Sequence, residues 1–69
     1  MYKLTRFFYH KICGQPICYN IIEQEFDSLI KLRNFVYTTY RYNYNSEEVG
    51  MDILFSNEMA DIHCIVEMR

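Results

Sequence analysis

The chain has 69 residues, of which 51% are hydrophobic and 23% charged, and its net charge is −2. This length allows one small α+β domain, residues 1–69, and folding of so short a chain buries only about 60% of its surface. The composition excludes a disordered chain, and no apolar run approaches the roughly 20 residues that a membrane helix needs.

The start of the chain carries two cations but lacks the apolar stretch and cleavage site of a secretory signal. Three cysteines are an odd number, which does not suit a disulfide framework. We therefore expect a cytoplasmic protein with reduced thiols.

Residues 2–12 are rich in aromatic and β-branched side chains, which predicts a first strand. Residues 13–16 predict a turn, because Gly14 permits a positive φ and Pro16 cannot donate to a sheet. Residues 17–24 return as a second strand. Alternation along this strand is expected to place three apolar side chains on one face: Ile17, Tyr19 and Ile21.

The hydrophobic period then changes, and Asp27 is expected to cap a helix over residues 28–41. Apolar side chains at helical spacing predict the stripe that packs on the sheet. They are Leu29, Leu32, Phe35, Val36, Thr39 and Tyr40. Residues 42–50 are rich in Asn, Ser and Glu and end in Gly, which predicts a loop.

Two more strands are expected over residues 51–55 and 60–68, and the second has the clearest alternation in the chain. The order ββαββ predicts an α+β fold, a two-layer sandwich with one helix packed on a four-stranded, mainly antiparallel sheet. The face away from the helix would lack a cover, so we expect that face or an edge strand to meet a partner. It should carry residues such as Phe7, Tyr9, His63 and Ile65.

Possible metal ligands are few: His10, Cys13, Cys18, His63 and Cys64. They lack the paired spacing of zinc sites, and neighbours on a strand point to opposite faces, so we expect no metal and no cofactor. A site around the first turn or a disulfide between Cys13 and Cys18 is the alternative. With two glycines there is no phosphate loop, and so short a chain has little volume for a pocket. We therefore expect no enzyme.

Two clusters suggest partners. The first strand interleaves cations with aromatic rings, a pattern that suits single-stranded nucleic acid or RNA: Lys3, Arg6, Phe7, Tyr9 and Lys11. The second cluster combines tyrosines, which are frequent in protein interfaces, with carboxylates that could imitate phosphates on a basic target. Its members are Tyr40, Tyr42, Tyr44, Glu47, Glu48, Asp52, Glu58 and Asp61.

The leading prediction is a non-catalytic protein-binding module, because a chain this small with no pocket is expected to act by occupying the surface of another protein. Residues 43–69 hold six acidic residues against one basic. The abundance of Ile, Tyr, Asn and Phe is typical of AT-rich coding sequence, as in many low-GC bacteria and their phages. This favours a phage or mobile-element inhibitor that occupies a host defence protein, such as a nuclease complex. The alternatives are the nucleic-acid-binding module and a homodimeric structural subunit that pairs edge strands.

Overall fold

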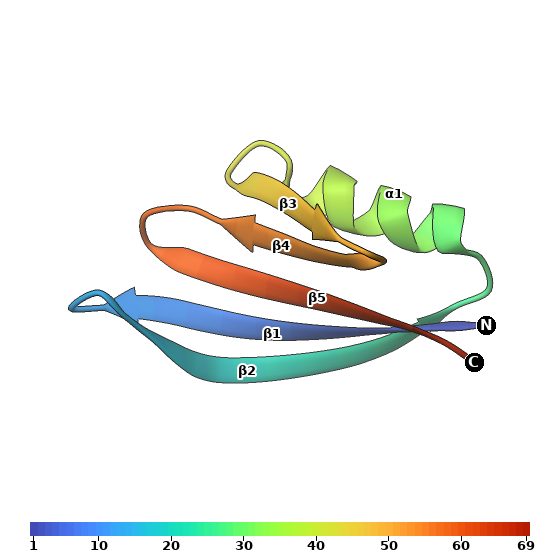
Figure 1. Cartoon of the computed structure of the whole chain (residues 1–69), viewed down its shortest axis with the longest axis horizontal. Coiled ribbons are helices and arrows are strands. Elements are labelled where there is room, and N and C mark those ends of the chain that lie inside the picture. Colours follow the sequence, from blue (N-terminus) through green and yellow to red (C-terminus); the bar gives the residue numbers. More distant parts are fainter.

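The computed structural model describes residues 1–69 and shows a five-stranded antiparallel sheet with one helix across one face (Figure 1). The elements are β1 (Tyr2–Ile12), β2 (Gln15–Phe26), α1 (Leu29–Tyr40), β3 (Asn45–Val49), β4 (Asp52–Ser56) and β5 (Ala60–Met68). The strands lie in the order β2-β1-β5-β4-β3. The predicted α+β fold, with one helix on an antiparallel sheet, is confirmed.

The predicted number of four strands is wrong, because β3 forms where a loop was expected and the order is ββαβββ. Gly50, with φ at 62°, reverses the chain so that β3 pairs with β4. All five β3 side chains are exposed, so this strand has no buried alternation that a sequence could reveal. Asn, Ser and Glu are weak strand formers, and pairing with β4 outweighs their propensity.

The β1–β2 hairpin turns at Cys13 and Gly14, which both have positive φ, at 53° and 77°. This is the pattern of a type I′ turn. A bulge follows, because Tyr9 pairs with Cys18 while Phe8 pairs with Asn20. The extra residue shifts the alternation, so Ile17 and Ile21 lie on opposite faces rather than on the shared face that was expected.

The helix begins one residue later than Asp27 would place it. Ser28 is the N-cap, and its Oγ accepts a hydrogen bond from the Lys31 backbone N–H at 3.2 Å. Asp27 instead accepts from the Lys31 ammonium group, also at 3.2 Å. Serine and aspartate are about equally good caps, so their adjacency left the start of the helix ambiguous by one residue.

The hydrophobic core lies between α1 and the sheet, and the helix contributes a narrow stripe of three buried residues: Leu32, Val36 and Tyr40. The sheet contributes Leu4, Ile53, Phe55, Ile62, Cys64 and Val66. Thr39, which was expected in the stripe, is exposed and donates to the Phe35 carbonyl. The tip of the β1–β2 hairpin extends beyond the helix (Figure 1).

The last strand, β5, occupies the centre of the sheet, where it pairs with β1 on one side and β4 on the other. The two hairpins, β1–β2 and β3–β4, are therefore joined only through β5. No helix of the structure has the length and apolar character needed to cross a membrane.

Candidate functional site

The sheet face opposite α1 has no element packed on it, and we call it the open face. Residues that pair directly across antiparallel strands share a face. One such row crosses all five strands: Ile21, Phe7, His63, Leu54 and Glu47. The next row contains Tyr9 and Asp61, and a third contains Thr5 and Ile65. The four residues expected on the uncovered face, Phe7, Tyr9, His63 and Ile65, therefore do lie there.

The centre of the open face is apolar and aromatic. The rings of Tyr9 and His63 lie 4.7 Å apart between centroids, tilted by 46°. Beside them is a shallow hollow of about 100 Å³, lined by Val49, Asp52, Ile53, Leu54, His63 and Ile65. Half-buried apolar side chains without a covering element are a surface that another molecule can use.

Acidic side chains surround this apolar centre. The register and alternation place six carboxylates on the open face: Glu23, Glu25, Glu47, Asp52, Asp61 and Glu67. Only two ammonium groups share it, those of Lys3 and Lys11. The Arg69 guanidinium also lies at its edge, 3.9 Å from Glu25, so the face has a formal excess of three negative charges.

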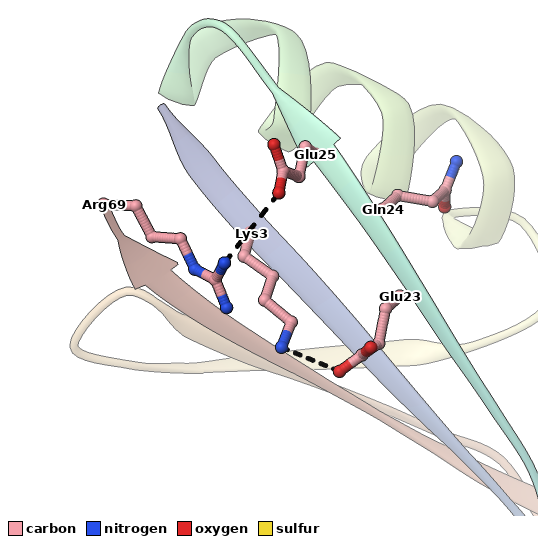
Figure 2. A pocket seen from close by; sticks show the side chains of 5 residues that line it. All are labelled: Lys3, Glu23, Gln24, Glu25 and Arg69. Atoms are coloured by element: carbon pink, nitrogen blue, oxygen red, sulfur yellow. Dashed lines mark ion pairs between the residues drawn. The ribbon is translucent and has the colours of Figure 1, made fainter.

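Lys3 lies at the end of the open face where the two chain ends meet. Its ammonium group is 2.7 Å from the Glu23 carboxylate, and this hydrogen bond lowers the pKa of Glu23. Arg69 and Glu25 approach to 3.9 Å beside it. With Gln24 these residues line a polar cavity of about 330 Å³ (Figure 2). Every charge drawn there has an opposite charge as its neighbour.

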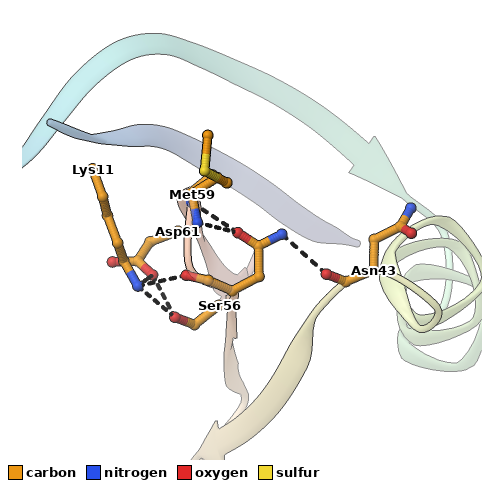
Figure 3. Close-up of polar contacts among 7 residues, drawn as sticks. Lys11, Asn43, Ser56, Met59 and Asp61 are labelled. Carbon is orange, nitrogen blue, oxygen red and sulfur yellow. Dashed lines mark hydrogen bonds and ion pairs between the residues drawn. The ribbon is translucent and has the colours of Figure 1, made fainter.

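Lys11 lies at the other end and fixes the β4–β5 turn (Figure 3). Its ammonium group is 3.1 Å from Asp61 Oδ1, and it also donates to the Asn57 carbonyl at 2.7 Å. Ser56 Oγ donates to the same Asp61 oxygen at 2.6 Å. Although burial opposes the effect, hydrogen bonds from Ser56 and Lys11 keep the pKa of Asp61 below its ordinary value. Asp61 is therefore ionised and neutralised within the protein.

The structure divides the predicted nucleic-acid cluster. Phe7, Tyr9, Lys3 and Lys11 lie on the open face, but Arg6 lies on the opposite face beneath α1 and is 8% exposed. Its guanidinium donates to Tyr40 and Gln24 instead of facing solvent. The two lysines of this cluster already have carboxylate partners.

The predicted tyrosine and carboxylate cluster is also dispersed. Tyr40 is in the core, Tyr44 packs against that core, and Tyr42 is 81% exposed at the exit of the helix. Glu48 faces the helix, where both its oxygens accept from Arg33, at 2.8 and 3.1 Å. Tyr37 also donates to it at 2.8 Å. Hydrogen bonds from Arg33 and Tyr37 lower the pKa of Glu48 to about 2.

Three members of that cluster do lie on the open face: Glu47, Asp52 and Asp61. Asp52 Oδ1 accepts the Val66 backbone N–H at 2.9 Å, and Glu47 and Glu58 are exposed without an ion pair. Leu54 also lies on the open face, although the sequence analysis did not place it there. Its position between the buried Ile53 and Phe55 is the signal that could have done so.

The candidate metal ligands do not converge. No group of three or more His, Cys, Asp or Glu side chains is placed to hold a metal ion. Cys18 pairs with Tyr9, whereas Cys13 lies four residues farther along at the turn. At the rise of a strand this separates them by roughly 13 Å, about twice the reach of a disulfide. All three cysteines are free.

No family model, curated protein or solved structure matches this chain.

Proposed function

We propose that this chain is a non-catalytic protein-binding module whose open face occupies a basic surface of another protein. The observation that supports this proposal is the apolar centre of that face, Phe7, Tyr9, Leu54 and Ile65, within an excess of three negative charges. A buried apolar centre with a charged rim is the usual anatomy of a protein interface. Complementary charge would steer a basic partner to it.

The partner we favour is a nucleic-acid-handling enzyme, such as a nuclease complex of a host defence system, which the chain would inhibit in the cytoplasm. Surfaces that bind phosphates are basic, and the carboxylates of the open face offer the same sign of charge as phosphates. The abundance of Ile, Tyr, Asn and Phe is typical of AT-rich coding sequence and is consistent with a phage or mobile-element origin.

Self-association through the open face is less favourable than binding of a basic protein to it. Two copies placed face to face would oppose carboxylates with carboxylates, and like charges across an interface are repulsive. Nucleic acid would meet the same repulsion, because the lysines of this face are paired with Glu23 and Asp61.

The test is site-specific photocrosslinking in cells that express the chain. A benzophenone amino acid at Phe7 should crosslink to a basic protein, whereas the same group at exposed Tyr42 should not. The crosslink from position 7 should weaken in 0.5 M salt, since charge contributes to binding. Equal crosslinking from both positions, or crosslinks to nucleic acid, would contradict the proposal.

A further inference from the structure

We propose that the hollow beside β4 and β5 is the anchor site for one aliphatic side chain, Leu, Ile or Met, on a partner segment that also carries lysine or arginine. The inference rests on the proposed protein-binding function and adds what the partner must present.

The size and lining of the hollow favour an aliphatic side chain as its occupant. The hollow measures about 100 Å³, and three apolar side chains of the open face line it, Val49, Leu54 and Ile65, whereas the side chain of Ile53 lies in the core. A closed apolar cavity of ~150 Å³ holds benzene. A hollow two thirds of that size suits an aliphatic side chain better than a whole aromatic side chain. A single side chain seated in a pocket at the centre of an interface commonly carries much of the binding energy.

The charge around the hollow favours a cationic residue beside that side chain. Asp52 lines it directly, and Glu47 pairs with Leu54 on the same face. Neither carboxylate has an ion-pair partner, whereas Glu23 and Asp61 on the same face are paired with lysines. The uncompensated negative charge of the open face is therefore greatest beside the hollow. A lysine or arginine next to the seated aliphatic side chain would form ion pairs with these carboxylates.

A second copy of the chain paired along the free edge of β2 is a competing mode of binding, and the geometry of that strand disfavours it. The free edge of β2 displays Ile17, Tyr19 and Ile21, each about half exposed. The bulge at Tyr19 places Ile17 and Ile21 on opposite faces, which interrupts any regular pairing of β2 with itself.

The experiment titrates the isotope-labelled protein with three capped pentapeptides and follows backbone amide shifts by NMR. The first has leucine between two pairs of lysines, the second replaces leucine by alanine, and the third replaces the lysines by glutamates. We expect the leucine–lysine peptide to shift the amides of Leu54, His63 and Ile65. The alanine peptide should bind at least about fivefold more weakly, and the glutamate peptide should cause no shifts.

Variants locate the binding. Val49 is 65% exposed, so Val49→Ser removes an apolar wall of the hollow with little effect on the core. It should weaken the leucine–lysine peptide several-fold without changing its salt dependence. The double variant Glu47→Gln/Asp52→Asn should weaken binding mainly at low salt. Its matched control, Asp27→Asn/Glu58→Gln, removes two exposed carboxylates that do not lie on the strands of the open face and should leave binding unchanged.

Equal binding of the leucine and alanine peptides, or shifts confined to other strands, would overturn the anchor site. The proposed function would survive that result if crosslinking from position 7 still captured a basic protein. It would fail separately if that crosslink were absent while the peptide bound in the hollow as expected.

Discussion

The guanidinium of Arg6 donates a hydrogen bond to the hydroxyl of Tyr40 at 3.0 Å, and this buried contact joins β1 to the last turn of α1. The Arg6 guanidinium also lies over the Phe35 ring, 5.0 Å from its centroid. Its other acceptor is the neutral side chain of Gln24, and its Nε has no partner. The helix is therefore held on the sheet by a charged donor as well as by its narrow apolar stripe.

Tyr40→Phe tests this contact. The substitution keeps the ring in the core but removes the acceptor of a buried cation, so the free energy of unfolding should fall by about 1.5–3 kcal/mol. Urea unfolding followed by circular dichroism measures the change. Tyr42→Phe, which alters an exposed hydroxyl, is the matched control and should leave stability unchanged. Equal stability of the two variants would show that Arg6 does not need this acceptor.

The ionisation of Glu48 should make the stability of the folded protein depend on pH in acidic solution. Its pKa is lowered to about 2 in the folded protein by Arg33 and Tyr37, so the folded state favours the ionised carboxylate. This stabilisation is complete above the unfolded pKa of about 4.3 and is lost as the pH falls towards 2. Glu48→Gln should flatten the decline in melting temperature over that range, whereas Glu47→Gln should not. If the melting temperature declined with the same slope in both variants, the Arg33–Glu48 pair would be excluded as the source of the pH dependence.

The three thiols should react at different rates. Cys13 and Cys18 are exposed, whereas Cys64 is buried and burial raises its pKa to about 12. Since the thiolate is the reactive form, Ellman's reagent should modify two thiols in the native protein and the third only on unfolding. Cys64→Ala should remove only the slow thiol. Three thiols reacting together in the native protein would contradict the buried position of Cys64.

Single-stranded nucleic acid should bind weakly or not at all. Arg6 is buried on the far side of the sheet, and Lys3 and Lys11 are paired with carboxylates. Fluorescence anisotropy with a labelled thymidine oligonucleotide and a matching RNA should therefore detect no binding at 25 mM salt. Salt-sensitive binding that is lost in Phe7→Ser would instead support the nucleic-acid interpretation of the first strand.

The sequence predicts those elements whose burial is periodic. β5 alternates Ile62, Cys64 and Val66 with outward residues, and the structure buries these three. The stripe of α1 was likewise visible at helical spacing. β3 was missed because none of its side chains is buried, so its position depends on Gly50 and on pairing with β4.

The candidate site was predictable only in part. The absence of a second covering element indicated an open face, and alternation placed Phe7 and His63 on it. Charge alone indicates the acidic cluster, and charge does not reveal partners distant in sequence. Glu48 is paired with Arg33, 15 residues away, and Asp61 with Lys11, 50 residues away. Such pairs depend on strand order, which a single sequence does not display.

The central place of β5 has a consequence for how the chain folds. Hairpins β1–β2 and β3–β4 can form early from local contacts, but each is a two-stranded ribbon, which is only marginally stable alone in water. Residues 60–68 continue the β3–β4 hairpin through a short turn, so the core should close when they also pair with β1. During synthesis on a ribosome, the sheet therefore cannot be completed until this last strand has left the exit tunnel. The rate of folding should then be limited by closing the long loop between β1 and β5.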